Sequence, residues 1–334
     1  MLRMAATILE MAAQLCRDFP NVPSLTLAKR LYAENKEHIA SIESARSSVR
    51  KARGNHGERV RKLATVPRVS QKAGWKPACP PSLAEPWVPF DLGDGCCVLS
   101  ISDCHIPYHD LCALEAVVKF AKRRHRPTVL LLNGDFGDFY RISRFQQDPK
   151  RRDLRDEIEL QKRGLQWLRS QFRKARFVFK FGNHEQRWDK YIWNKAPELW
   201  NLDNVQLHNL LEFEGLGIER VGDQPVMAGK LPILHGHELP RGISSPVNQA
   251  RGAFLRTLHS LLVGHGHRTS THCEPDMFGK EITTWSQGCL CELSPPFMRI
   301  SKWNWGFAVI DVAKDGQYDL HNYRLGGRYE VRAA

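Results

Sequence analysis

The chain has 334 residues, of which 42% are apolar, and a formal net charge of +13. This length leaves room for one large domain and a smaller one, because single hydrophobic cores stop growing at about 250 to 300 residues. No apolar run approaches the roughly 20 residues of a membrane span, so we expect a cytoplasmic protein without a membrane partner. The positive charge instead favours a polyanionic partner. None of the nine cysteines forms a Cys-x-x-Cys pair, so we interpret them as reduced thiols.

The first 65 residues are predicted to form a small, all-helical domain. We expect helices at 4–19, 24–35 and 41–54, separated by Pro20, Pro23 and a short polar stretch. Ser24 and Ser41 are each placed to cap the helix that follows. A short helix, a turn and a third helix rich in Arg and Ser are typical of a helix-turn-helix module.

The third predicted helix carries a basic face. Arg46, Arg50 and Arg53 fall at i, i+4 and i+7, which places them on one side of the helix, and Lys51 belongs to the same basic run. We interpret these four residues as a surface that contacts nucleic acid, with DNA as the expected partner. A solvated charged face is the alternative.

A change of pattern separates this domain from the rest of the chain. Residues 66–94 are rich in proline and show no sustained period, so we interpret them as a linker. Over residues 95–334, short apolar runs alternate with longer segments of helical periodicity, which predicts an α/β domain built of layers. The apolar runs end in Asp, His or Asn. Because ligand sites in α/β folds gather at strand ends, we expect these side chains to converge.

Five short motifs follow the apolar runs. In chain order they are Asp103-x-His105, Gly134-Asp135-x-x-Asp138, Gly182-Asn183-His184-Glu185, His235-Gly236-His237 and Gly264-His265-Gly266-His267. Each motif is weak by itself, but five in order indicate a metal centre. Two divalent cations can clamp a phosphate and lower the pKa of a water molecule between them. Such a pair needs a bridging carboxylate, for which Asp135 is the candidate, while imidazole and amide ligands add no further negative charge.

The motifs and their order resemble those of the calcineurin-like metallophosphoesterases, over about Val98 to Tyr323. The resemblance implies an α/β fold in which a two-sheet β-sandwich is flanked by helices. It implies one metal held by Asp103, His105, Asp135 and His267, and a second held by Asp135, Asn183, His235 and His265. His184 would donate a proton to the leaving oxygen, and Asp138 would orient His184. The expected cofactors are two divalent metal ions, with manganese favoured and iron or zinc as alternatives.

Two features of the motifs leave alternatives open. His237 is the alternative to His235 as the ligand of the fourth motif, and His235 is favoured because it follows the apolar run directly. Protein phosphatases of this family usually follow the second motif with Arg-Gly, whereas Phe139 and Tyr140 follow it here. This departure disfavours a dedicated protein phosphatase, although Glu185 and Arg187 keep that alternative open.

The leading hypothesis is a dinuclear metal-dependent phosphodiesterase that acts on nucleic acid, a DNA nuclease whose N-terminal helices dock on DNA. The alternative is a phosphomonoesterase or protein phosphatase whose N-terminal module binds a partner. A DNA-binding protein with a purely structural metal site is a third hypothesis, but such a site would have no use for the proton donor His184. The combination of a basic arm and a catalytic domain resembles proteins of phage or prophage origin.

Overall fold

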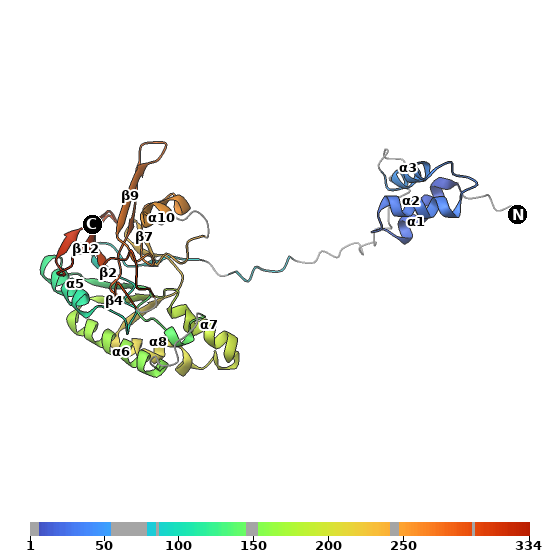
Figure 1. The fold of residues 1–334 in the computed structure, drawn as a ribbon. Helices are drawn as coiled ribbons and strands as arrows, with labels where there is room; N and C mark the ends of the chain where they lie inside the picture. Colours follow the sequence, from blue (N-terminus) through green and yellow to red (C-terminus); the bar gives the residue numbers. More distant parts are fainter. Residues whose placement is uncertain (1–6, 55–78, 85–86, 145–152, 241–246, 296–297) are drawn as a thin grey trace. The chain divides into compact units, whose positions relative to one another are not determined.

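The computed structural model describes all residues except 1–6, 55–78, 85–86, 145–152, 241–246 and 296–297. The chain divides into two compact units, Met1–Ala84 and Glu85–Ala334 (Figure 1). The predicted boundary between residues 65 and 66 lies outside the described residues. No helix in the described part of the chain combines the length and the apolar character needed to cross a membrane.

The first unit contains three helices, α1 (Ile8–Asp18), α2 (Ser24–Glu34) and α3 (Ile42–Ala52). Their bounds lie within a few residues of those expected from the sequence. Small and aliphatic side chains form the shared core, among them Ala12, Leu27, Leu31, Ala45 and Val49. The alanines let the helices approach closely, so a core of few residues holds the unit together.

Side-chain caps begin two of these helices. The Ser41 hydroxyl accepts a hydrogen bond from the first turn of α3 at 3.1 Å, as predicted, and Thr7 forms a capping box at the start of α1 that was not expected. The predicted cap at Ser24 is wrong. Pro23 occupies the N-cap position of α2, and the Ser24 hydroxyl instead accepts a hydrogen bond from the Arg53 guanidinium.

The second unit contains two sheets and the helices around them. Its strands are β1 (Phe90–Asp91), β2 (Cys97–Ile101), β3 (Val129–Asn133), β4 (Arg176–Lys180), β5 (Ile218–Val221), β6 (Val226–Ala228), β7 (Leu231–Leu234), β8 (Leu261–Val263), β9 (Ser270–Pro275), β10 (Glu281–Ser286), β11 (Gly306–Val312), β12 (Tyr318–Leu325) and β13 (Val331–Ala333). Its helices are α5 (Leu111–Arg124), α6 (Leu154–Gln171), α7 (Glu185–Lys195), α8 (Leu207–Leu210), α9 (Phe213–Leu216) and α10 (Gln249–Thr257), with the short 3-10 helices η1 (Tyr140–Ile142), η2 (Pro197–Leu199) and η3 (Asp203–Val205).

The two sheets form the sandwich that the resemblance implied. The larger sheet has seven strands in the order β13-β12-β11-β2-β3-β4-β5, and the smaller sheet has six in the order β1-β6-β7-β8-β10-β9. The helices α5 and α6 lie along one side of the sheets (Figure 1). The strand β1 falls within the segment interpreted as a linker and pairs in parallel with β6, so the sandwich includes residues before 95.

Alternate side chains of the larger sheet face two different cores. Val98 and Leu131 pack with Ile233 of the smaller sheet, between the two layers. Their neighbours Leu99 and Leu130 point the other way, into the core that includes α5 and α6. Because both faces are covered, the central parallel strands appear in the sequence as continuous apolar runs.

The parallel order of the strands decides where the polar motifs meet. The neighbouring strands β2, β3 and β4 run in the same direction, so their carboxyl ends lie at one edge of the larger sheet. Asp103, Asp135 and Asn183 follow these three strands. In the smaller sheet β7 and β8 are also parallel neighbours, and His235 and His265 follow them. The motifs therefore come from both layers of the sandwich.

Candidate metal centre

Five of the predicted ligands have left-handed backbone conformations. The angle φ is 56° at Asp103, 51° at His105, 53° at Asp135, 61° at His265 and 55° at His267. Non-glycine residues rarely adopt such angles, and those that do cluster at functional sites where the surrounding structure holds them. Here the first two motifs are joined through the backbone, because the His105 N–H donates to the Asp135 carbonyl at 3.0 Å.

Asp103, His105 and His267 form the first group of candidate ligands. Asp103 Oδ1 lies 3.0 Å from His267 Nε2, and the Nε2 atoms of His105 and His267 are 3.1 Å apart. The other oxygen of Asp103 accepts hydrogen bonds from the Ser102 hydroxyl at 2.5 Å and from the His265 N–H at 3.0 Å. The carboxylate is thereby held with Oδ1 toward the imidazoles.

Asp135, His235 and His265 form the second group. Asp135 Oδ2 lies 3.2 Å from His235 Nε2, and the ring centroids of His235 and His265 are 5.1 Å apart. His235 Nδ1 donates to the Asn133 carbonyl at 2.7 Å, so Nε2 is the nitrogen that faces Asp135. The geometry favours His235 over His237 as the ligand of the fourth motif, because His237 Nδ1 lies 3.4 Å from Glu238 instead.

The buried carboxylates draw positive charge to two of these imidazoles. Burial lowers the pKa of His235, but the charge of Asp135 outweighs burial and raises this pKa to about 10. Burial likewise lowers the pKa of His267, and the charge of Asp103 raises it to about 9. A metal cation bound to either imidazole would replace the proton that the neighbouring carboxylate attracts.

The donor atoms at this position fit divalent cations. Among the described residues, Asn183 Oδ1 is buried and lacks a hydrogen-bond partner, and the buried Asp103 Oδ1 and His235 Nε2 contact only other candidate ligands, His267 and Asp135. A buried polar atom without a partner destabilises the folded state. The buried carboxylates of Asp103 and Asp135 also bring two negative charges into the same candidate centre. Carboxylate oxygen, amide oxygen and imidazole nitrogen are ligands that manganese, iron and zinc accept. Cations would therefore satisfy these atoms and offset the charge.

His184 is held by Asp138 and Arg187. Its Nδ1 lies 2.8 Å from the Asp138 carbonyl oxygen and 3.3 Å from Asp138 Oδ1, and its Nε2 lies 2.8 Å from Arg187 Nη2. Because a guanidinium only donates, Nε2 accepts and Nδ1 carries the hydrogen. Asp138 Oδ1 is also 3.2 Å from His105 Nδ1. Burial raises the pKa of Asp138, but hydrogen bonds and charges from His105 and His184 outweigh burial and place this pKa below the usual range.

A cavity of about 550 Å³ opens beside these side chains. His105, Asp138, His184 and His267 form one part of its lining, and the other part includes Tyr108, Tyr140, Pro295, Met298 and Trp303. The Trp303 and His267 rings meet edge to face, with centroids 4.2 Å apart. Among the described residues that line the cavity, Arg187 is the one lysine or arginine. The candidate centre thus borders a largely aromatic and apolar wall.

Comparison with known proteins identifies the family. Residues 98–296 match the family model of the Calcineurin-like phosphoesterases. The chain belongs to the calcineurin-like phosphoesterase family. It is accordingly a hydrolase that acts on phosphoric ester bonds, in a family that uses divalent metals.

Two phage proteins are similar to this phosphoesterase, which agrees with the expected phage or prophage character. The Gene 54 proteins of Mycobacterium phages L5 and D29 are each 28% identical to it, over 70% of this chain and 96% of their own length. Among solved structures, a metallophosphoesterase from Sphaerobacter thermophilus is 17% identical over 70% of this chain and 89% of that one, with a TM-score of 0.37. A Vps29 mutant from Entamoeba histolytica is 15% identical over 71% and 97%, with a TM-score of 0.37.

Glu185 is a site residue of the phosphoesterase whose role sequence reasoning missed. Its fully buried carboxylate accepts hydrogen bonds at 2.8–3.1 Å from the backbone N–H groups of Asp135, Phe136, Gly137 and Gly182. These donors belong to the loops after β3 and β4, so one side chain fixes the second and third motifs together. The acidic residue that ends the third motif was the available signal.

A buried ion pair that was also missed fixes the fourth motif. Lys180 is 0% exposed, and its Nζ lies 2.8 Å from Glu238 Oε1. Glu238 in turn accepts hydrogen bonds from the N–H groups of His235 at 3.2 Å and Gly236 at 2.6 Å. Burial raises the pKa of Glu238, but the Lys180 charge outweighs burial and lowers this pKa to about 2. A lysine at the end of the apolar run of β4 was the signal in the sequence.

The basic residues of the first unit differ in their surroundings. Arg50 and Lys51 are exposed, and Arg46 is half-buried, 3.6 Å from Glu43. The Arg53 guanidinium donates to the Ser24 hydroxyl and to carbonyls of the turn before α2. These bonds hold α3 against that turn, and the contact of Arg53 with nucleic acid stays a prediction.

The close packing of Gly182 against Asp135 generates a first prediction. A Cβ at residue 182 would lie 2.3 Å from Asp135 Oδ1, whereas a Cβ at Gly215 would meet no atom within 4 Å. Gly182→Ala is therefore expected to displace the Asp135 carboxylate and lower manganese affinity at least ~10-fold, measured by equilibrium dialysis. Gly215→Ala is the control and should bind as the parent does. Equal affinities in the two variants would contradict the placement of Asp135 in the metal site.

The burial of Glu157 generates a second prediction. Burial and the charge of Asp138 raise the pKa of Glu157 from 4.5 to about 8. Between these two values the folded protein binds more protons than the unfolded chain, so the stability contributed by protonated Glu157 falls as the pH rises from 4.5 to 8. Both proteins are measured in chelator at pH 5 and at pH 8. From pH 5 to pH 8 the free energy of unfolding should decrease more in the parent than in Glu157→Gln, by ~1 kcal/mol or more. Parallel urea-unfolding profiles of the two proteins would contradict the assignment.

Proposed function

We propose that this phosphoesterase is a metal-dependent phosphodiesterase that acts on nucleic acid, a DNA nuclease of the cytoplasm. The observation that carries this proposal is the cavity wall of Tyr108, Tyr140, Pro295, Met298 and Trp303 beside the candidate metal centre. Nucleobases stack on aromatic side chains with little dependence on sequence, so such a wall suits a nucleotide next to the scissile bond.

The lining of the cavity offers little positive charge, which also favours a phosphodiester substrate. Arg187 is the one lysine or arginine among the described lining residues, and it already contacts the Asp138 carbonyl and His184. A phosphodiester carries one negative charge, whereas a phosphomonoester carries about 1.5 to 2 near neutral pH. With two cations and a single guanidinium, the site is matched better to the diester, and the monoesterase alternative is an outcome of the test below.

The proposed ligand roles follow the two groups of side chains. One cation would be held by Asp103, His105, Asp135 and His267, and the other by Asp135, Asn183, His235 and His265. When bound, the two cations would neutralise phosphate charge and lower the pKa of a water molecule at the site. Manganese is the proposed metal. The same mixture of oxygen and nitrogen ligands also accepts iron and zinc, which are the alternatives.

His184, Asp138 and Arg187 would handle the proton of the leaving group. His184 Nε2 faces Arg187, which holds it as an acceptor. A phosphate oxygen would draw the Arg187 guanidinium away, because arginine binds anionic oxygens more strongly than a neutral imidazole. His184 Nε2 would then be free to hold a proton for the leaving oxygen. Asp138, at 3.3 Å from His184 Nδ1, would orient the ring for this transfer.

The proposed docking surface on DNA is the exposed part of α3 in the first unit. Arg50 and Lys51 are exposed there, with Arg46 on the same helix. The net charge of +13 would add to the attraction through release of counterions from DNA.

Hydrolysis of a panel of esters tests the proposed reaction. The substrates are bis-p-nitrophenyl phosphate, p-nitrophenyl phosphate, and labelled single- and double-stranded DNA, each with manganese and with chelator. We expect manganese-dependent cleavage of the diester and of DNA. Turnover of the monoester with intact DNA would contradict the nuclease and favour the phosphomonoesterase or protein phosphatase.

Substitutions in the site separate metal binding from proton transfer. Asp135→Asn and His265→Ala are expected to abolish metal-dependent turnover, because each removes a proposed ligand. His184→Ala should keep its metals and lose ~100-fold or more in kcat, the scale of losing a general acid. His235→Ala should lose one metal, and His237→Ala serves as its matched control with full metal content. Metal content by mass spectrometry and kcat by the diester assay are the readouts, and full activity of Asp135→Asn would contradict the dinuclear site.

Charge reversal on α3 tests the docking surface. In Arg50→Glu/Lys51→Glu, two proposed phosphate contacts are lost, so the slope of log affinity against log salt for DNA should fall by about 2. The control Lys122→Glu/Arg123→Glu makes the same change of net charge on α5, and its slope should stay near that of the parent. Fluorescence anisotropy with labelled DNA measures both. Equal slopes in the two variants would contradict docking through α3.

A further inference from the structure

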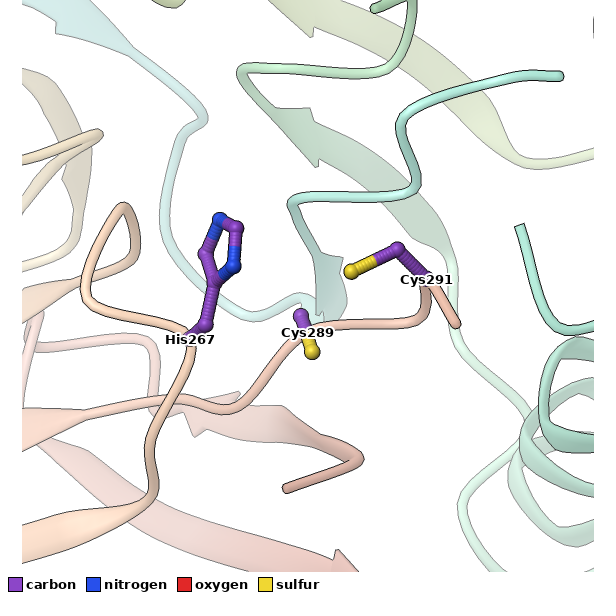
Figure 2. A group of neighbouring side chains, drawn as sticks. All are labelled: His267, Cys289 and Cys291. Carbon is purple, nitrogen blue, oxygen red and sulfur yellow. The ribbon is translucent and has the colours of Figure 1, made fainter. Parts of the chain in front are cut away.

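Two cysteines lie against a proposed ligand of the metal centre. Cys289, Cys291 and His267 are all buried, and one potential ligand atom from each lies within 4.8 Å of the others. Figure 2 shows both cysteines on one chain segment, next to the His267 ring. Neither cysteine has a role in the proposed reaction. The cluster shares His267 with the first group of candidate ligands, but it adds two sulfur atoms that neither of the two groups around Asp103 and Asp135 contains.

The His267 ring has a second nitrogen that the metal centre does not use. Nε2 lies 3.0 Å from Asp103 Oδ1 and 3.1 Å from His105 Nε2. Nδ1 is buried and has no hydrogen-bond partner in the described structure. The residue as a whole is only 8% exposed, so solvent offers little replacement for that partner. A histidine that binds a metal through one nitrogen normally donates the other N–H to a carboxylate, a carbonyl or water. Because that partner is missing for Nδ1, the ring offers an unused ligand position.

Two thiols and an imidazole suit softer cations than the manganese proposed for the catalytic centre. Sulfur ligands select soft and borderline cations such as zinc, cadmium and copper(I), whereas carboxylates suit manganese and magnesium. In a tetrahedral site with sulfur at ~2.3 Å and nitrogen at ~2.0 Å from zinc, ligand atoms lie ~3.5 to 3.8 Å apart. Side-chain movement of ~1 Å would bring atoms within 4.8 Å to that spacing.

We propose that His267 Nδ1, Cys289 and Cys291 form a second, inhibitory site for a thiophilic divalent cation such as zinc or cadmium. Binding would release the two thiol protons to solvent. To offer its Nδ1 lone pair, neutral His267 carries its hydrogen on Nε2, so that nitrogen no longer serves the first group of the catalytic centre. Occupation of the thiol site and of the manganese site that contains His267 therefore oppose each other. The inhibition depends on the proposed role of His267, whereas cation binding by the cluster does not.

Cadmium titration of the full-length, manganese-loaded protein tests the binding. Cadmium bound to thiolate sulfur gives a charge-transfer absorption band in the ultraviolet. We expect this band to saturate at one cadmium per chain and to be lost in Cys289→Ser/Cys291→Ser. The control Cys96→Ser/Cys97→Ser removes an adjacent, half-buried pair outside the cluster and should keep the band. An unchanged band in Cys289→Ser/Cys291→Ser would overturn the site. If that variant does not fold, Cys291→Ala alone should reduce the band by about half, and an unchanged band would overturn the site as well.

Inhibition and manganese release test the coupling. Cadmium should displace one manganese per chain from the parent and from the control, and it should slow their diester hydrolysis. Relative to its own cadmium-free rate, Cys289→Ser/Cys291→Ser should need at least ~10-fold more cadmium for the same inhibition. Equal inhibition of both variants, or a saturated cadmium band without manganese release, would overturn the coupling. A protein that forms the band but hydrolyses no ester would contradict the proposed function while leaving the binding site intact.

Discussion

The Glu185 carboxylate is the contact on which the candidate metal centre depends. It accepts four backbone hydrogen bonds, from Asp135, Phe136, Gly137 and Gly182, and so ties the loop after β3 to the loop after β4. The arrangement is costly, because burial and the nearby charge of Asp135 raise the pKa of Glu185 to about 7. Backbone donors offset part of this cost, and cations bound at Asp135 would offset more of it.

Buried acids also hold two other parts of the site. Glu238, paired with Lys180, fixes the backbone that carries His235, and Asp138 contacts His184. Such support leaves the ligand atoms pointing at one place while the aromatic side of the cavity remains apolar. A rigid, charged centre beside an apolar wall is what a phosphodiester with an attached base would require. This is the physical basis of the proposed nuclease activity.

The fold and the motifs could be predicted because their signals are local. The ligand Asp135 follows a continuous apolar run, which marks the end of a buried strand, and the spacing of apolar residues marks the three N-terminal helices. Contacts made through tertiary structure could not be predicted. The prediction that Ser24 caps α2 is wrong, because the Ser24 hydroxyl accepts a hydrogen bond from Arg53, 29 residues away. The proximity of Cys289 to His267 depends on how the segment after β10 returns to the site, for which no sequence pattern exists.

Asp135 is proposed to bind both metal ions, and anomalous diffraction can test this role. Crystals of the full-length protein soaked in manganese and measured near the manganese absorption edge would locate each ion. We expect two peaks ~3.5 to 4 Å apart, both within bonding distance of the Asp135 carboxylate. A single peak, or two peaks of which neither contacts Asp135, would contradict this role.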